Sequence, residues 1–333
     1  MSTTTEALAS EFGLRCIACG GGPLAEKERA LACPECSARY PVTRGIVRML
    51  PRHLRGGGGD LEADEDAATR RRTGESFGYE WEHFGQLRPE WRMNFLGYMQ
   101  PHAPEFFDGI KVLDVGTGSG RHASEAAALG SRVAAVDIGS SIEVARRNLP
   151  DDVMTVQADA EQLPFEDEGF DFVMSIGVLH HLPDPARALN GLVRLARRGG
   201  RVHVYLYWWP ARRVHRLILR IVAALRRITT RLPHPLLHAL CYPLALLLWL
   251  FVVTPFRILR GVPRLSRLAD AFPLKAYADY PFGVLVNDQF DRFSAPIERR
   301  FTRREVEQLM REAGLVEVTV TPHHGWVADG RRP

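Results

Sequence analysis

The chain has 333 residues, of which 46% are hydrophobic and 25% are charged, and its formal net charge is +4. This length excludes a single small module, because it can hold a small N-terminal domain, one large α/β domain and a further part. The modest net charge hides a strong asymmetry. Residues 185–269 carry sixteen arginines and no Asp or Glu, which leaves 27 basic against 39 acidic residues elsewhere.

Four cysteines near the N-terminus form two closely spaced pairs. Cys16 and Cys19 are followed, after thirteen intervening residues, by Cys33 and Cys36. Two such pairs suit tetrahedral zinc, and four thiolates leave no open coordination position, so the metal would be structural. Disulfides are the alternative. The first ten residues lack the basic and apolar regions of a secretory signal peptide, which favours a reducing compartment and zinc.

A glycine-rich segment follows a buried strand further along the chain. Residues 110–115 are mostly apolar and short enough for a central parallel strand, and residues 121–129 form an alanine-rich helix pattern. Gly116, Gly118 and Gly120 stand between them, where missing Cβ atoms let backbone approach a ligand. Because residue 121 is arginine, the spacing departs from the dinucleotide fingerprint G-x-G-x-x-G. A nicotinamide cofactor is therefore disfavoured.

Strand and helix patterns alternate from there to residue 206. Strands are predicted over 131–136, 153–157, 170–176 and 200–205, with an amphipathic helix over 185–197. This alternation predicts a parallel sheet with helices on both faces, whose strand ends meet in one crevice. Asp137 ends the second strand, 17 residues beyond Gly120, where a carboxylate can accept both hydroxyls of a ribose. Asp159 follows the third strand, and His180 and His181 follow the fourth.

The ordered motifs over residues 111–206 resemble the core of a class I S-adenosylmethionine-dependent methyltransferase. The segment Asp114-x-Gly116-x-Gly118-x-Gly120 resembles the first motif of that family. Phe170-Asp171 through His180-His181 resembles the fourth-strand motif of small-molecule methyltransferases of the ubiquinone and menaquinone type. The resemblance implies a Rossmann-like, mostly parallel seven-stranded sheet whose last strand is antiparallel. Residues 315–321 and 325–328 would supply the last two strands, after a helix over 303–313 capped by Thr302.

The resemblance also implies a cofactor and residue roles. The cofactor would be S-adenosyl-L-methionine, with Asp137 on its ribose and Asp159 and Ala160 beside its adenine. The aromatic-rich segment 77–99 would pack over the cofactor or onto the sheet edge. Methyl transfer depends on alignment, and His180 or His181 could add a base or an orienting donor, or merely fill polar space. The implied cofactor contacts are Asp114, Gly116, Gly118, Gly120, Asp137, Ile138, Asp159, Ala160 and Ser175.

The N-terminal module has a resemblance of its own. Leu14-Arg15-Cys16, together with Tyr40-Pro41-Val42 and Gly45-Ile46, resembles the zinc-ribbon activator subunit of tRNA and translation-factor methyltransferases. We therefore expect five parts. They are a zinc ribbon over 1–54, a flexible glycine-rich and charged linker over 55–73, the cofactor half of the core over 74–206, a helical insertion over 207–290, and the C-terminal part of the core over 291–333.

The insertion contains most of the excess arginines. Apolar residues from Val214 to Ile228 recur at helical spacing with arginines between them, which predicts a basic amphipathic helix. Residues 236–256 carry no formal charge when His238 is neutral and are long enough for a membrane span. Pro243 and Pro255 interrupt this run, and a span would separate the fifth strand from the final helix. An interfacial lid is favoured, with buried dimerisation or substrate-cap helices as the alternative.

Two functional classes fit these observations. The first is a methyltransferase for a small-molecule or lipid-linked acceptor, cytoplasmic or peripheral at the inner face of the membrane. The alternative is a zinc-ribbon methyltransferase of rRNA or tRNA bases, because arginine-rich helices bind phosphate. The motif Leu179 to Pro183 and the apolar residues between the arginines favour the first class. Residues 207–270 would then contact a membrane or form a homodimer, and RNA is a less favoured partner. A non-enzymatic scaffold is a weaker alternative, because a scaffold would not need every cofactor-binding position to be intact.

Overall fold

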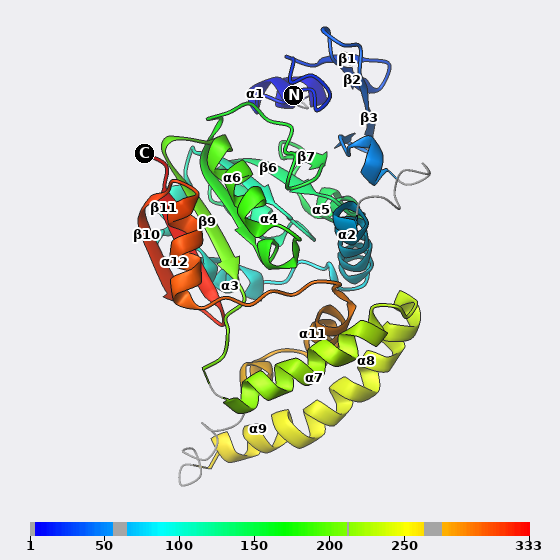
Figure 1. Ribbon diagram of the computed structural model, residues 1–333, viewed down its shortest axis with the longest axis vertical. Helices are drawn as coiled ribbons and strands as arrows, with labels where there is room; N and C mark the ends of the chain where they lie inside the picture. Colours follow the sequence, from blue (N-terminus) through cyan, green and yellow to red (C-terminus); the bar gives the residue numbers. More distant parts are fainter. Residues whose placement is uncertain (1–3, 56–64, 212, 263–274) are drawn as a thin grey trace. The chain divides into compact units, whose positions relative to one another are not determined.

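The computed structural model describes residues 4–55, 65–211, 213–262 and 275–333, and it contains two compact units (Figure 1). Unit 1 comprises residues 1–210 and 297–333, and unit 2 comprises residues 211–296. The chain therefore leaves unit 1 after its fifth parallel strand and returns to it before its last helix.

Unit 1 begins with a short helix and a small antiparallel sheet. The helix α1 (Thr5–Glu11) begins at Thr4, whose side chain accepts a hydrogen bond from the Ala7 amide. Consecutive strands then pair antiparallel, and β4 also pairs in parallel with β7 of the main sheet, with Val47 opposite Val156. These elements are β1 (Ala25–Lys27), β2 (Ala30–Ala32), β3 (Arg39–Thr43), β4 (Ile46–Arg48) and the 3₁₀ turn η1 (Arg52–Leu54).

The main sheet has five parallel strands followed by an antiparallel pair. In space their order is β7-β6-β5-β8-β9-β11-β10, and β11 runs antiparallel to both of its neighbours. The predicted seven-stranded, mostly parallel sheet is confirmed, and the ribbon strands extend it beyond β7. The strands are β5 (Lys111–Val115), β6 (Arg132–Asp137), β7 (Met154–Gln157), β8 (Phe170–Ile176), β9 (Ala196–Leu206), β10 (Val316–Pro322) and β11 (Trp326–Arg331).

Helices cover both faces of this sheet, because alternate strand residues point to opposite sides. Leu113 and Val115 belong to one core cluster with α1, α6 (Pro185–Leu195) and α12 (Arg303–Glu312). Val112 belongs to the other cluster, with α3 (Glu90–Tyr98), α4 (Arg121–Ala128) and α5 (Ser141–Asn148). Thr302 caps α12 in a reciprocal capping box with Glu305, as its sequence predicts.

The segment before the sheet differs from its prediction. Residues 65–84 form the helix α2 (Glu65–Phe84), followed by α3 and the 3₁₀ turn η2 (Pro104–Phe107), so the linker predicted over 55–73 does not hold for residues 65–73. Residues 56–64 of that prediction lie outside the described residues. Arg70 on α2 is buried in ion pairs with Asp159 and Glu161. Such tertiary contacts override a composition rich in charge and glycine.

Unit 2 is helical, and α11 packs against both α7 and α8. The predicted arginine-rich helix is present as α7. Residues 234–260 form one continuous helical stretch that is long and apolar enough, by length and composition, to cross a membrane. The described elements are α7 (Arg213–Thr229), α8 (His234–Leu248), the π-helical turn η4 (Trp249–Val253), α9 (Thr254–Arg260), η5 (Lys275–Asp279) and α11 (Phe282–Ser294).

Candidate active site

The glycine turn lies at the carboxyl end of β5, as the sequence predicts. Gly116, Gly118 and Gly120 have φ values of +76°, +57° and +81°, which residues with a Cβ rarely adopt. The amides of Gly116 and Thr117 both donate to the Val136 carbonyl, which joins the turn to the neighbouring strand β6. The turn is therefore held in a left-handed conformation against the end of β6.

Two buried carboxylates flank the turn. Asp137 accepts hydrogen bonds from the amides of Gly118 (3.0 Å) and Gly139 (2.9 Å) and from the Ser141 hydroxyl (2.5 Å). Burial raises the pKa of Asp137, although these hydrogen bonds oppose the effect. Burial likewise raises the pKa of Asp114 to about 7, against the hydrogen bond that Thr117 donates to it. A cationic or hydroxylated ligand would favour the ionised form of both groups.

Helix α2 lies directly over this turn. A Cβ on Gly118 would meet the indole nitrogen of Trp81 at 2.7 Å, and a Cβ on Gly74 would meet the Ile138 side chain at 2.9 Å. The Arg121 guanidinium, at the start of α4, lies 5.2 Å from the ring centroid of Trp81 and 5.1 Å from that of Trp91. Trp81 of the aromatic segment therefore lies against the glycine turn, and Ile138 is in contact with α2.

The acidic residue after β7 pairs with the same helix. Arg70 on α2 contacts Asp159 at 3.1 Å and Glu161 at 2.5 Å, and all three side chains are buried. Ala160, which lies between Asp159 and Glu161 in the sequence, is partly exposed. The sequence reasoning missed Arg70 because its charged neighbours resembled a linker.

Ser175, a predicted cofactor contact, is buried inside the sheet. Its hydroxyl donates to the Val115 carbonyl at 2.9 Å, between β8 and β5. This hydrogen bond joins β8 to the strand that ends at the glycine turn, and the contact of Ser175 with the cofactor stays a prediction.

The two histidines after β8 lie together in the 3₁₀ turn η3 (Leu179–His181). Their ring centroids are 4.3 Å apart, and both side chains are buried. His181 Nδ1 lies 2.6 Å from the Ile297 carbonyl, an acceptor, so Nδ1 carries the proton and Nε2 keeps its lone pair. Neither ring nitrogen of His180 has a hydrogen-bond partner among the described residues. Burial, with the charges of His181 and Arg300, holds the pKa of His180 well below its ordinary value.

A cluster of aromatic and imidazole rings continues from this pair. His180 stacks on Tyr207 at 3.9 Å, and Tyr98 lies 4.9 Å from Tyr205 and 5.6 Å from His122, all between ring centroids. His122 is buried, and neither of its ring nitrogens has a hydrogen-bond partner among the described residues. Burial, followed by the charges of Arg121 and His203, holds its pKa well below the ordinary value. The sequence reasoning missed His122 and Tyr98, whose proximity depends on how α3 packs against α4.

A separate polar cluster joins β9 to β11. Asp329 accepts from His102 at 2.8 Å and from Arg201 Nε at 2.6 Å, and it lies 3.1 Å from His203 Nδ1. Burial raises the pKa of Asp329, but the hydrogen bonds from His102 and His203 outweigh it and hold the pKa far below the usual range. Because the Arg201 guanidinium occupies the carboxylate, a cation there is disfavoured, and the cluster supports the strand pair.

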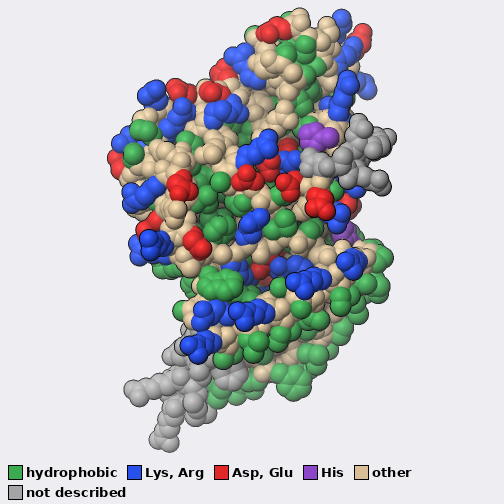
Figure 2. All heavy atoms as spheres, in the orientation of Figure 1, with side chains coloured by type: hydrophobic (Ala, Val, Ile, Leu, Met, Phe, Trp, Pro, Cys, Tyr) green, Lys and Arg blue, Asp and Glu red, His purple; other side chains and the backbone are tan. Residues whose placement is uncertain are grey.

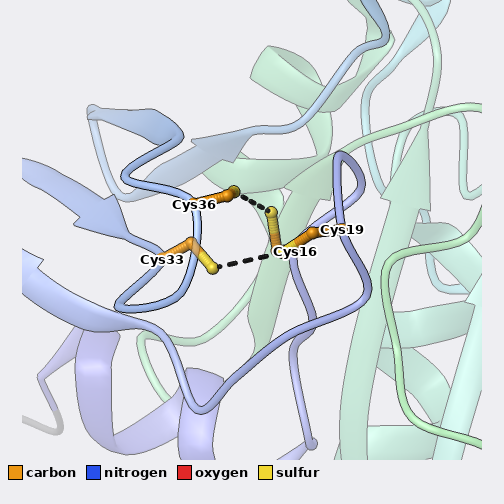
Figure 3. A group of neighbouring side chains, drawn as sticks. All are labelled: Cys16, Cys19, Cys33 and Cys36. Atoms are coloured by element: carbon orange, nitrogen blue, oxygen red, sulfur yellow. Dashed lines mark hydrogen bonds between the residues drawn. The ribbon is translucent and has the colours of Figure 1, made fainter.

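The four N-terminal cysteines converge as predicted (Figure 3). The sulfur atoms of Cys16 and Cys36 are 3.5 Å apart, and those of Cys19 and Cys33 are 3.6 Å apart. These separations are close to the roughly 3.8 Å between ligands of tetrahedral zinc with Zn–S bonds of about 2.3 Å. They are far longer than a disulfide bond of about 2.05 Å. The thiols are free, and the Gly21 amide donates to the Cys19 sulfur, so the donor set fits a zinc ion.

Comparison with known proteins finds methyltransferases similar to this chain. Residues 113–204 match the family described as a methyltransferase domain, so unit 1 contains a class I S-adenosylmethionine-dependent methyltransferase core. A demethylmenaquinone methyltransferase from Clavibacter sepedonicus is 35% identical over 122 residues, 34% of this chain and 50% of that protein. A ubiquinone biosynthesis O-methyltransferase from Idiomarina loihiensis is 30% identical over 154 residues, 43% of this chain and 60% of that protein. The chain thus spans only half to three fifths of the length of these relatives.

A solved structure is also similar to this chain. It is a complex of the Haloferax volcanii Trm112 methyltransferase activator with a methyltransferase, 14% identical to this chain, covering 78% of this chain and 98% of that one with a TM-score of 0.45.

Proposed function

We propose that this protein transfers a methyl group from S-adenosyl-L-methionine to a small-molecule or lipid-linked acceptor. The observation that carries the proposal is the left-handed glycine turn, held between two buried carboxylates at the same sheet edge as a buried histidine pair. The matched methyltransferase domain spans both features.

The donor would be held by residues of β5, β6, β7 and the turns that follow them. Asp137 would accept the ribose hydroxyls, and the glycine turn would allow close approach of the donor's amino-acid part. Asp114, Ile138, Asp159 and Ala160 complete the proposed contacts. When bound, the donor supplies an electrophilic methyl group on a sulfonium.

The histidine pair and the ring cluster would hold the acceptor. Because Ile297 fixes the proton on His181 Nδ1, the lone pair on Nε2 can accept a proton from an acceptor hydroxyl or amine. His180 stays neutral, and its ring nitrogens have no hydrogen-bond partner in the part of the chain that the structure describes. Alignment of the acceptor supplies most of the catalysis, and proton removal adds to it.

We propose in addition that Cys16, Cys19, Cys33 and Cys36 bind one structural zinc ion. The sulfur separations support tetrahedral coordination, and four thiolates leave no position open for chemistry. Reduced thiols and zinc are consistent with a cytoplasmic protein.

The acceptor class can be tested with a labelled methyl donor. We expect purified protein and S-adenosyl-L-[methyl-³H]methionine to label a component of a cellular lipid and small-molecule extract, and not purified rRNA or tRNA. At a limiting donor concentration the substitution Asp137→Ala should lower labelling about 10- to 100-fold. Asp151→Ala, which changes a 98% exposed carboxylate, should not. Labelling of RNA instead would show that the alternative, an RNA base methyltransferase, is correct.

A further inference from the structure

Helix α7 leaves most of its apolar side chains exposed within unit 2, whereas Leu219 and Val222 are half-buried. Its contact with α11 is polar in the last turn of α7. There the buried Arg226 donates through Nε and Nη2 to the Arg292 carbonyl, and Thr229 donates to the Phe293 carbonyl. The apolar stripe of α7 is exposed, with Val214 67% accessible. A soluble cap would bury this stripe. The exposed apolar residues of α7 are Val214, Leu217, Ile218, Ile221, Leu225 and Ile228.

The long helical stretch over residues 234–260 exposes further apolar side chains. Only 22% of its most apolar window is buried, and Phe251 is 71% exposed. Figure 2 shows these hydrophobic side chains along the edge formed by α8 and α9, with a row of basic side chains along α7. The exposed apolar residues here are Leu236, Leu240, Tyr242, Leu246, Leu247, Leu250, Phe251 and Ile258. Together with the α7 stripe we call them the apolar face.

Arginines border the α7 part of the apolar face. They recur at helical spacing on one side of the stripe, and no acidic residue occurs from 185 to 269. No ion-pair partner is present for them within the described ranges 4–55, 65–211, 213–262 and 275–333. This pattern of unpaired cations beside exposed aliphatic side chains is complementary to anionic phosphate groups above acyl chains. The arginines of this row are Arg213, Arg216, Arg220, Arg227 and Arg231.

Packing within unit 2 argues against a transmembrane span. Leu237, Cys241 and Ala245 form a buried stripe on α8, the helix that packs most extensively against α11. The partner helix α11 carries Asp288 and Asp291, charges that are costly in hydrocarbon. A helix covered in this way cannot be surrounded by lipid, so the apolar face would enter the bilayer from one side only.

We propose that the apolar face and the arginine row dock unit 2 peripherally on an anionic lipid bilayer. A symmetric dimer through the same surface would bring two unpaired arginine rows together, which opposes association. RNA would pair with the arginines but would leave the aliphatic side chains exposed to water. This proposal does not depend on methyl transfer, although membrane docking would bring a lipid-linked acceptor to the protein.

Vesicle flotation tests the docking. The full-length protein should float with phosphatidylcholine vesicles that contain phosphatidylglycerol, and binding should fall at least tenfold on pure phosphatidylcholine or in high salt. The paired substitution Leu247→Glu and Phe251→Glu should lower binding at least tenfold. The matched control is Met93→Glu on α3, a 73% exposed apolar residue of unit 1 that should leave binding unchanged.

A second pair of variants tests the arginine row. Arg220→Gln with Arg227→Gln should weaken binding to anionic vesicles and reduce its salt dependence. The control pair Arg147→Gln with Arg304→Gln removes two exposed arginines of unit 1 and should have no effect. Binding of S-adenosylmethionine is measured by calorimetry on every variant. A variant that keeps this binding is folded, so its loss of vesicle binding is separate from the proposed methyl transfer.

Three results would overturn the docking proposal. One is no flotation of the wild-type protein on anionic vesicles. Another is flotation that the Leu247→Glu and Phe251→Glu variant retains. The third is a wild-type protein that is a dimer by light scattering and does not bind vesicles, together with a Leu247→Glu and Phe251→Glu variant that is a monomer. The apolar face would then bind a second copy of the chain.

Discussion

His122 and His180 are buried imidazoles whose ring nitrogens lack hydrogen-bond partners among the described residues. Burying such a group without a partner costs about 1–3 kcal/mol, so the positions are unfavourable unless something else satisfies them. Both belong to the ring cluster at the carboxyl end of β9, where Tyr98 and Tyr205 meet. A polar acceptor bound there would satisfy them, which supports the proposed acceptor site.

The two histidines of η3 should have separable effects on catalysis. We expect His181→Gln to lower kcat by about 100-fold, the usual effect of losing a base, without changing donor affinity. His180→Phe should instead raise KM for the acceptor. It should leave the pH–rate profile unchanged, because the lowered pKa of His180 keeps its ring neutral over the working range.

The control for these variants is His53→Gln, which changes an exposed histidine of η1. A His181→Gln enzyme with an unchanged kcat would contradict the base role of His181.

The small N-terminal sheet that carries the four cysteines has few strand pairs with the main sheet. The short strand β4 pairs with β7 over only three residue pairs, and β1 to β3 are attached through it. Four ligands that close loops in this small sheet would stabilise it through zinc binding.

Removal of zinc should therefore loosen the ribbon and the edge of the main sheet. We expect one zinc per chain by mass spectrometry, and the Cys33→Ser with Cys36→Ser variant should lose it, lower Tm by several degrees and speed amide exchange in β4 and β7. Cys241→Ser changes the fifth cysteine, which lies in unit 2, and should keep the metal. A metal-free wild-type protein with protected β4 amides would refute the zinc proposal.

Helix α2 shows where sequence reasoning reaches its limit. The strands, the glycine turn and the capped helix α12 have local signals in hydrophobic period and capping residues, and the structure confirms them. Residues 65–73 are rich in charge, a composition typical of a linker. In the structure Arg70 forms ion pairs with two carboxylates that are more than eighty residues away in the sequence. Gly74 and Gly78 interrupt the helix pattern, yet they allow α2 to approach Gly139 and Ser140 closely. Only the tertiary structure reveals such contacts.

At the scale of the whole molecule, the asymmetry of charge coincides with the division into units. Most of the segment 185–269, which has no Asp or Glu, lies in unit 2. The two buried carboxylates that flank the glycine turn, Asp114 and Asp137, lie in unit 1. The sequence predicted the amphipathic helix, but it could not predict that the apolar stripe of α7 faces outward. That orientation depends on the hydrogen bonds of Arg226 with α11.

Binding of the methyl donor tests the central claim most directly. Isothermal titration of S-adenosyl-L-methionine should show one site per chain for the wild-type protein and for Asp151→Ala. Asp137→Ala should bind about 10- to 100-fold more weakly, the expected cost of lost hydrogen bonds to a charged carboxylate. Absence of binding to the folded wild-type protein, or equal affinity in Asp137→Ala, would contradict the account of unit 1 as a methyltransferase that holds its donor at the glycine turn.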